Sequence, residues 1–344
     1  MKVAIGSNIK KNSFGGGNLF AINLQEYLYK KKCKVVNNLD DKDIDIILIT
    51  EIRKYLSISS FSIIDALKYK LNYNHDVKII IRVNENDERK KTFFLNKIIK
   101  LSISVSDHVI FISKYLNELF KIENNYSIIK NGANKKIFYN NMIRKSSSRL
   151  IKIVTHHWSA NYNKGFDFYK FLDQNCNKSK YYKIQFTYIG NIPKKFIFKN
   201  SIHITPLSGK NLSKELNNHD IYITATRNEP AGMHHIEAAC CGLPILYINS
   251  GALPEYCSEY GLEFNKDNLI SKIEEMHKNL DTFKKKLINY NYTSENSNKK
   301  YLDTFLKIKS IPNKKQKKIN LLYFYIRLNF LIILHRFSSK IFKK

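Results

Sequence analysis

The stretch Asn228–Pro244, which reads NEPAGMHHIEAACCGLP, is the most informative part of the chain. It follows the apolar run Ile221–Ala225 and places two carboxylates, Glu229 and Glu237, eight positions apart around the start of a predicted helix. Pro230 has a fixed φ and no N–H, so it suits the first turn of a helix. We therefore expect Glu229 in a loop, Glu237 inside the helix, and unpaired amides at the helix start that suit phosphate.

The composition describes a basic chain that is long enough for two domains. Its 344 residues exceed the usual domain size of roughly 100 to 200 residues. The 58 Lys and Arg against 29 Asp and Glu give a formal net charge of +29. This charge favours a polyanionic partner such as nucleic acid, acidic lipid or a phosphorylated ligand. A composition biased towards Lys, Asn and Ile explains the charge equally well, so both interpretations stay open.

Cysteine use and the N-terminus favour a cytoplasmic protein. The five cysteines are odd in number and show no C-x-x-C spacing, so they form no disulfide framework. The chain opens directly into the strand-like sequence VAIG at residues 3–6, without the long apolar region of a secretion signal.

The N-terminal half alternates apolar runs with helical segments. The predicted strands are Lys2–Gly6, Val35–Val36, Ile44–Thr50, Lys78–Val83, His108–Ile112 and Tyr126–Lys130. Continuous apolar strands separated by helices are typical of a parallel sheet that is covered on both faces. Ligands of such sheets gather at the carboxyl ends of the strands.

A glycine-rich loop at residues 8–18, NIKKNSFGGGN, follows the first strand and precedes a predicted helix at about 19–31. A strand, a glycine-rich turn and a helix allow the backbone to approach a phosphate or sugar closely. A flexible loop tip is the alternative. The three consecutive glycines do not match the spaced dinucleotide fingerprint, which disfavours a nicotinamide site.

The strand Lys78–Val83 ends in a polar cluster, RVNENDERK at residues 82–90. Arg82 and Asn84 lie nearest the strand end, so we expect them to contact a ligand. The charged run Asp87–Lys91 is interpreted as a solvated face.

A second series of strands follows a predicted interdomain linker at residues 140–149, NNMIRKSSSR. The predicted strands are Leu150–Thr155, Ile184–Ile189, Ile202–Thr205, Ile221–Ala225 and Pro244–Ile248. Their ends carry Gly, Ser, Asn, Lys and Glu, which describes a crevice for a phosphorylated, hydroxyl-rich ligand. These end clusters are His156–Trp158 leading to Lys164 and Gly165, Gly190–Asn191, Pro206–Ser208, Thr226–Glu237 and Asn249–Glu255.

Several of these motifs resemble retaining GT-B glycosyltransferases of the large family 4 type, the group 1 glycosyl transferases. Glu229 and Glu237 match the E-x7-E element, and the sequence continues with EAACCGLPIL and SGALPE as in that family. Lys164–Gly165, the glycine-rich loop, DHVIFISKYL at 107–116 and IIKNGANKKIF at 128–138 occur in the family's order. The resemblance extends from about residue 1 to residue 306.

The resemblance implies an α/β chain of the GT-B class, with two Rossmann-like doubly wound parallel-sheet domains facing a central cleft. It implies an acceptor-side domain at residues 1–148 and a nucleotide-sugar donor domain at 149–295. Residues 296–344 would form C-terminal helices that return to the first domain, lie at a membrane interface, or both.

Carried over residue by residue, the resemblance implies a role for each matching position. Glu237 would accept hydrogen bonds from the ribose hydroxyls of the donor, since a carboxylate suits a vicinal diol. A solvated helix carboxylate is the alternative for Glu237. The implied catalytic residues are Glu229, which holds the transferred sugar, Lys164 and Arg82. The implied donor-binding residues besides Glu237 are Gly232, Met233 and His234 at the helix start, Gly16 and Gly17 over the phosphates, Leu207 and Ser208 around the base, and Gly190.

Two departures from the family pattern affect these assignments. The family's arginine before the lysine is missing from HHWSANYNK at residues 156–164, so diphosphate binding would depend more on Lys164. Arg82 stands where the family often has a histidine, and Asn84 and Glu85 are the acceptor-side candidates. His234 and His235 are adjacent on a helix and cannot face one direction, so no metal site is predicted. The resemblance also implies no metal and no cofactor beyond the nucleoside diphosphate sugar substrate.

The C-terminus joins a basic run at residues 312–318 to an apolar segment, Ile319–Phe337, that is interrupted by Arg327, Asn329 and His335. These interruptions disfavour a membrane span. An interfacial helix beside a polybasic patch, binding an anionic membrane through residues 313–344, is one interpretation. A helix packed on the first domain is the other.

We therefore expect a metal-independent, hexosyltransferase-type enzyme that moves a sugar from a nucleoside diphosphate sugar to a glycan or lipid-linked acceptor. Retention of configuration and a role in surface polysaccharide or lipopolysaccharide assembly, at the inner face of the membrane, are expected. A sugar-nucleotide epimerase or phosphorylase on the same fold is one alternative. A non-enzymatic polyanion-binding protein is another, although nucleic acid is disfavoured because the interleaved aromatics of a nucleic-acid module are not evident.

Overall fold

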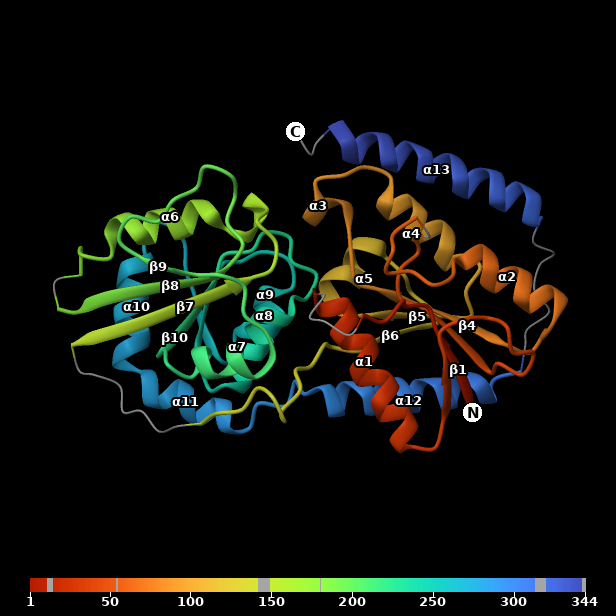
Figure 1. Ribbon diagram of the computed structural model, residues 1–344, viewed down its shortest axis with the longest axis horizontal. Helices are drawn as coiled ribbons and strands as arrows, with labels where there is room; N and C mark the ends of the chain where they lie inside the picture. The colour runs from red at the N-terminus through yellow and green to blue at the C-terminus, as the bar shows by residue number, and fades with distance from the viewer. Residues whose placement is uncertain (11–14, 54, 142–148, 180, 313–319, 342–344) are drawn as a thin grey trace. The chain divides into compact units, whose positions relative to one another are not determined.

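The computed structural model describes residues 1–10, 15–53, 55–141, 149–179, 181–312 and 320–341 (Figure 1). The chain divides into two compact units. Unit 1 comprises residues 1–130 and 297–344, and unit 2 comprises residues 131–296. The chain therefore enters unit 2 before the predicted boundary at 148–149. Residues 142–148 of the predicted linker lie outside the described part of the chain.

Unit 1 contains a six-stranded sheet in the order β2-β1-β3-β4-β5-β6, in which all neighbouring strands pair in parallel. The residues of β3, β4 and β5 are all buried, as their continuous apolar sequences predict. The strands are β1 (Lys2–Ile5), β2 (Lys34–Val36), β3 (Ile46–Ile49), β4 (Lys78–Val83), β5 (His108–Phe111) and β6 (Tyr126–Ile128).

The helices of unit 1 include two that return from the C-terminal end of the chain. Helix α1 begins at Gly15, earlier than predicted, so Gly16 and Gly17 form part of its first turn. The helices are α1 (Gly15–Lys30), α2 (Ile63–Asn72), α3 (Asp87–Lys90), α4 (Leu95–Ile103), α5 (Lys114–Phe120), α12 (Ser294–Ser310), which begins in unit 2, and α13 (Leu321–Ile341).

Unit 2 repeats the architecture with a second parallel sheet, in the order β12-β11-β10-β7-β8-β9. Strand β7 is two residues longer than predicted, and it ends with His156 and His157. The short edge strand β12 was not predicted. The strands are β7 (Leu150–His157), β8 (Lys183–Gly190), β9 (Ile202–Ile204), β10 (Ile221–Thr224), β11 (Ile245–Tyr247) and β12 (Gly261–Glu263).

The helices of unit 2 correct one prediction. Pro230 does not lie in the first turn of a helix, because α8 begins at Met233 with Gly232 as its N-cap residue. In the loop before α8, the Ala231 carbonyl accepts a hydrogen bond from Asn131 Nδ2 at 2.9 Å. The helices are η1 (Tyr162–Lys164), α6 (Phe166–Asn175), α7 (Gly209–Leu216), α8 (Met233–Cys240), α9 (Leu253–Cys257), α10 (Leu269–Lys278) and α11 (Leu280–Ile288).

Each sheet contains a position where the direction of strand addition reverses. In unit 1 it lies between β1 and β3, and in unit 2 it lies between β7 and β10. The connections that leave the two central strands there run to opposite faces of the sheet, and the gap between them at the carboxyl ends forms a crevice in which doubly wound proteins bind ligands. The topology therefore indicates where each unit should bind a ligand.

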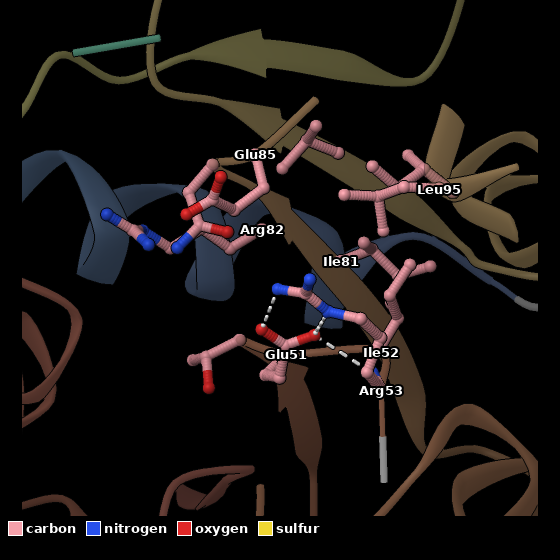
Figure 2. Close-up of a pocket in the computed structure, with 11 residues that line it drawn as sticks. Glu51, Ile52, Arg53, Ile81, Arg82, Glu85 and Leu95 are labelled. Atoms are coloured by element: carbon pink, nitrogen blue, oxygen red, sulfur yellow. Dashed lines mark hydrogen bonds and ion pairs between the residues drawn. The ribbon is translucent and has the colours of Figure 1, made fainter. Parts of the chain in front are cut away.

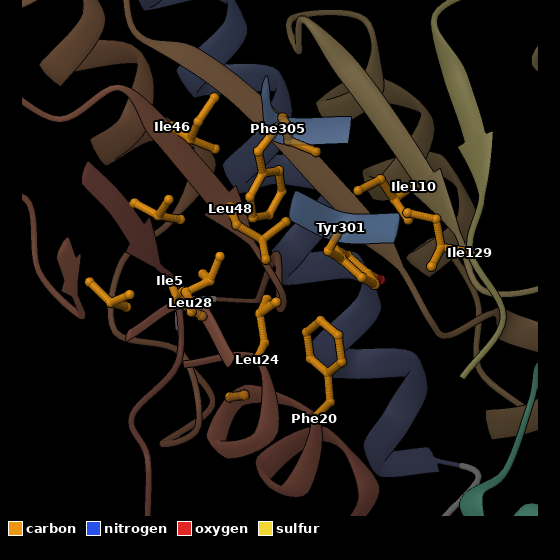
Figure 3. Packing of buried hydrophobic residues seen from close by; sticks show 14 of the residues in the cluster. Ile5, Phe20, Leu24, Leu28, Ile46, Leu48, Ile110, Ile129, Tyr301 and Phe305 are labelled. Carbon is orange, nitrogen blue, oxygen red and sulfur yellow. The ribbon is translucent and has the colours of Figure 1, made fainter. Parts of the chain in front are cut away.

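The core of unit 1 depends on helix α12 (Figure 3). Its Tyr301 and Phe305 pack against residues from the sheet and from α1, and the rings of Tyr301 and Phe20 lie 5.0 Å apart between centroids. Tyr301 and Phe305 are fully buried. The return of the chain to unit 1 thus contributes side chains to its hydrophobic core.

We predict that Phe305→Ala lowers the free energy of unfolding by about 3 to 5 kcal/mol, because it leaves a cavity in this core. Leu306→Ala is the matched control, since Leu306 is 51% exposed on the same helix. Urea unfolding of both variants measures the difference. Equal losses in the two variants would contradict the role of α12 in the core.

Candidate functional site

Two carboxylates from the β10 side of unit 2 meet two basic side chains from the β7 side. Lys164 Nζ lies 2.8 Å from Glu229 Oε2, and both side chains are buried, Glu229 to 1% exposure. Lys164 comes from η1, just after β7, whereas Glu229 lies in the loop after β10. The ion pair therefore bridges the point where strand order reverses.

The second pair crosses the same point. His156 is the second-last residue of β7, and its Nε2 lies 2.9 Å from Glu237 Oε2 on α8. An ionised carboxylate only accepts hydrogen bonds, so His156 donates from Nε2. The other oxygen, Oε1, has no hydrogen-bond partner among the described residues. The sequence indicated His156 as a strand-end residue but could not reveal that it holds Glu237.

Buried polar contacts beneath these pairs fix the ends of both strands. Tyr169 OH lies 2.8 Å from His157 Nε2 and accepts the Ala225 N–H at 3.2 Å. His234 Nε2 lies 3.0 Å from Thr224 Oγ1. The pKa of His234 is held well below its usual value by burial and by the neighbouring His157 and His235. His234 is therefore a neutral donor or acceptor at neutral pH.

Close packing explains two of the predicted donor-binding glycines. A Cβ at Gly190, whose φ is 140°, would lie 1.9 Å from the His157 carbonyl oxygen. A Cβ at Gly232 would lie 2.4 Å from the His234 ring and 3.1 Å from the Glu229 carboxyl carbon. Both positions require glycine because the backbone approaches the site residues closely.

The other predicted donor residues lie along the same carboxyl edge of the unit 2 sheet. Met233 is the first residue of α8, and Leu207 and Ser208 lie between β9 and α7. The structure thus brings Lys164, Glu229, Glu237 and His234 together, and it places Leu207 and Ser208 two strands away from β7. Gly16 and Gly17 belong to unit 1, at the start of α1.

The acceptor-side candidates line a small cavity of about 20 Å³ in unit 1 (Figure 2). Arg82, Asn84 and Glu85 come from the end of β4. Arg82 is also tied to the core, because its Nε donates to Tyr301 OH at 3.1 Å and its guanidinium lies 3.9 Å from the Phe20 ring centroid. Glu85 Oε1 accepts from Arg89 Nη1 at 2.6 Å.

The same cavity contains a buried ion pair that the sequence reasoning missed. Arg53 donates from Nε to Glu51 Oε1 at 2.7 Å and from Nη2 to Glu51 Oε2 at 2.8 Å. These two residues follow β3 directly, in ITEIR at residues 49–53. The strand-end rule that selected Arg82 would have selected them too, because β3 lies beside the reversal of strand order in unit 1.

The described residues contain no group of three or more His, Cys, Asp and Glu side chains that could hold a metal ion. His235 therefore belongs to no candidate metal site among these residues. It is fully buried, its two ring nitrogens have no hydrogen-bond partner in the described part of the chain, and its ring packs on Tyr256 at 5.3 Å.

Helix α13 packs on unit 1, as the second interpretation of the C-terminus expected. One face packs on α4, with Phe324 and Leu328 buried and His335 Nδ1 2.8 Å from the Phe93 carbonyl oxygen. The opposite face exposes a stripe of five apolar residues, which we call the α13 stripe: Leu322, Ile326, Phe330, Ile333 and Phe337. By length and composition, residues 321–340 could also cross a membrane. Of the predicted basic run, residues 313–318 lie outside the described residues.

The two doubly wound parallel-sheet units have the GT-B fold. Residues 159–300 match the sequence family described as "Glycosyl transferases group 1", which confirms the resemblance to group 1 glycosyltransferases. This range contains Lys164, Glu229 and Glu237. None of the curated proteins compared with the chain matches its sequence.

Solved GT-B structures show the same fold at low sequence identity. HepE from Anabaena, solved with UDP-glucose, superposes with a TM-score of 0.67 at 11% identity, covering 89% of this chain and 100% of HepE. AviGT4, a glycosyltransferase of avilamycin A biosynthesis, gives 0.62 at 10% identity over 90% of this chain and 98% of AviGT4. Sucrose-phosphate synthase from Thermosynechococcus elongatus gives a TM-score of 0.58 at 12% identity, covering 90% of this chain and 96% of the synthase.

We predict that acid destabilises the protein partly through His235. Burial lowers the pKa of His235 from 6.5 to about 4, so the unfolded chain takes up this proton first as the pH falls. The stability contributed by neutral His235 is complete above pH 6.5 and is lost as the pH falls towards 4, by about 2 kcal/mol at pH 5.

Urea unfolding at pH 7 and pH 5 measures this effect, with His235→Phe as the comparison. The variant keeps a ring against Tyr256 but cannot titrate, so it should lose less stability between the two pH values than the native protein. An unchanged pH dependence in the variant would show that other groups cause the acid sensitivity.

Proposed function

We propose that the protein transfers a sugar from a nucleoside diphosphate sugar to a glycan or lipid-linked acceptor, with retention of anomeric configuration. The observation that carries the proposal is the pair of contacts Lys164–Glu229 and His156–Glu237 at the reversal of strand order in unit 2. A basic group and two carboxylates at this edge suit a diphosphate and its hydroxyl-bearing sugars.

The roles of the site residues follow from what each can offer. The free Oε1 of Glu237 accepts from a ribose hydroxyl, while His156 holds the carboxylate in place. Lys164 neutralises the departing diphosphate, and Glu229, which it holds, accepts from a hydroxyl of the transferred sugar. Gly232, Met233 and His234 present the start of α8 to the phosphates.

The proposed reaction breaks the bond between the anomeric carbon and the diphosphate oxygen, and forms a bond from the same face to the acceptor hydroxyl oxygen. The acceptor proton passes to the departing diphosphate, which leaves as a nucleoside diphosphate. Glu229 and Glu237 are both engaged by basic groups, which supports this route over a covalent carboxylate intermediate. Lys164 supplies positive charge, so we propose that transfer requires no metal ion.

We propose unit 1 as the acceptor side, with Arg82, Asn84 and Glu85 at its cavity contacting the acceptor. Glu85 Oε2 is buried and has no hydrogen-bond partner within the described residues, so it can accept from an acceptor hydroxyl. A surface polysaccharide or lipopolysaccharide intermediate is the acceptor class that fits the membrane contact proposed below.

Glu237→Gln should weaken binding of the donor by about tenfold or more, because it replaces a charge-assisted hydrogen bond to ribose with a neutral one. Calorimetric titration with common nucleotide sugars, in the presence of a chelator, measures this loss. Glu275→Gln is the matched control, since Glu275 pairs with Lys272 on α10. Donor affinity that is unchanged in Glu237→Gln would refute the site assignment.

We further propose that the α13 stripe rests on an anionic membrane surface. The buried face of α13 already packs on α4, so the exposed face is available for lipid. The helix has no acidic residue, and its Arg327, Arg336 and Lys340 are exposed. Each basic residue near an anionic bilayer contributes about 1 kcal/mol, and the apolar stripe adds the burial of its side chains.

The double variant Ile326→Ser/Phe330→Ser should bind vesicles of phosphatidylglycerol at least about tenfold more weakly than the native protein, because it removes two apolar side chains from the stripe. Cosedimentation measures binding, and phosphatidylcholine vesicles test the need for anionic lipid. Leu306→Ser, on the exposed face of α12, is the control variant. Full binding by the double variant would indicate another membrane surface or none.

A further inference from the structure

The chain has one tryptophan, and the structure places it directly after β7. Trp158 is 53% exposed. No aromatic ring or cation packs on its ring within the described part of the chain. A large apolar ring that the fold leaves in solvent contributes little to stability. Its position therefore suggests a contact with something other than the protein's own core.

Trp158 occupies a defined place among the site residues. His156, two residues earlier, holds Glu237, and Lys164, six residues later, holds Glu229. The loop that carries Trp158 therefore begins and ends at the two buried pairs. A ligand that contacts both pairs must pass close to this loop.

The backbone of Trp158 is fixed to the next strand. Asn191 Nδ2, just beyond the end of β8, donates to the Trp158 carbonyl oxygen at 2.7 Å. His157 and Gly190, the last residues of β7 and β8, are paired in register. Trp158 thus lies at the carboxyl ends of β7 and β8, on the side of β7 that leads towards Leu207 and Ser208 after β9.

We propose that the Trp158 ring packs against the nucleotide of the donor, between the ribose site at Glu237 and the predicted base site at Leu207 and Ser208. The inference rests on the proposed function, since it requires a nucleotide at this edge of unit 2. An aromatic ring binds a planar base or ribose without a charge, which suits a loop that has no arginine between residues 156 and 164.

The single tryptophan gives a direct measurement. Fluorescence of the native protein is titrated with UDP, GDP, ADP and TDP, and with the corresponding nucleosides and nucleotide sugars. We expect the best ligand to quench the emission at the same concentrations at which calorimetry detects heat. Quenching by the nucleoside alone would support the contact with base and ribose, whereas quenching only by the diphosphate would overturn it, because the ring would then contact the phosphate end of the nucleotide.

Substitution tests whether the contact contributes to affinity. Trp158→Ala should bind the same nucleotide about tenfold more weakly, as expected for one stacked aromatic contact, and Trp158→Phe should retain most of the affinity. Tyr181→Ala is the matched control, because exposed Tyr181 precedes β8 and lies at the opposite, amino edge of the same sheet. Circular dichroism and thermal unfolding establish that each variant folds.

The outcomes separate this inference from the proposed function. Calorimetric binding of a nucleotide with no change in emission, or with unchanged affinity in Trp158→Ala, would overturn the role of Trp158 and leave the donor site intact. Failure of every nucleotide and nucleotide sugar to bind the native protein would overturn both.

Discussion

The site of unit 2 depends on one topological constraint, the reversal of strand order between β7 and β10. The loops that follow these strands leave towards opposite faces of the sheet. One backbone hydrogen bond, from the Arg227 N–H to the Asn163 carbonyl at 2.8 Å, joins them, and side chains make further contacts across the gap. The Lys164–Glu229 ion pair and the His156–Glu237 hydrogen bond are two of these contacts. Tyr169 does the same deeper in the protein, because its hydroxyl contacts both His157 and the Ala225 amide. The residues of the proposed site therefore also help to hold the ends of the two central strands together.

A buried ion pair such as Lys164–Glu229 contributes little net stability to a fold. Removing two charges from water costs several kcal/mol per ion, and an apolar pair of similar volume often stabilises a protein more. Glu229 is 1% exposed and Lys164 8% exposed, so the fold bears most of this desolvation cost. For the proposed function the benefit is preorganisation, since Lys164 and the two carboxylates are already oriented for a charged ligand. His234 and His235 are buried and uncharged, so they add no competing charge beside Lys164 and Glu229. Burial also strengthens the attraction between these two charges.

The sequence predicted the architecture well because buried parallel strands leave a strong signal of continuous apolar residues. Eleven predicted strand runs correspond to strands of the two sheets. Strand β12, with the sequence GLE, was missed because it contains only one large apolar residue. Helix starts were predicted less well, because they depend on distant contacts. Asn131, 100 positions away, donates a hydrogen bond to the Ala231 carbonyl in the loop before α8, and no local pattern reveals this contact. The sequence could not predict which residues contact the site residues for the same reason, since His156 and Glu237 are 81 positions apart.

The two units use charge differently, and this difference bears on what each can recognise. In unit 2 the buried pairs join separate segments, so their geometry is fixed by the whole fold. In unit 1 the charges at the cavity pair within their own loops, Arg53 with Glu51 two residues away and Arg89 with Glu85 four residues away. Local pairs can be altered by changing one loop without disturbing the sheet. A fixed site suits a ligand with invariant chemistry, such as a nucleoside diphosphate, whereas locally paired loops suit acceptors that differ from one enzyme to the next.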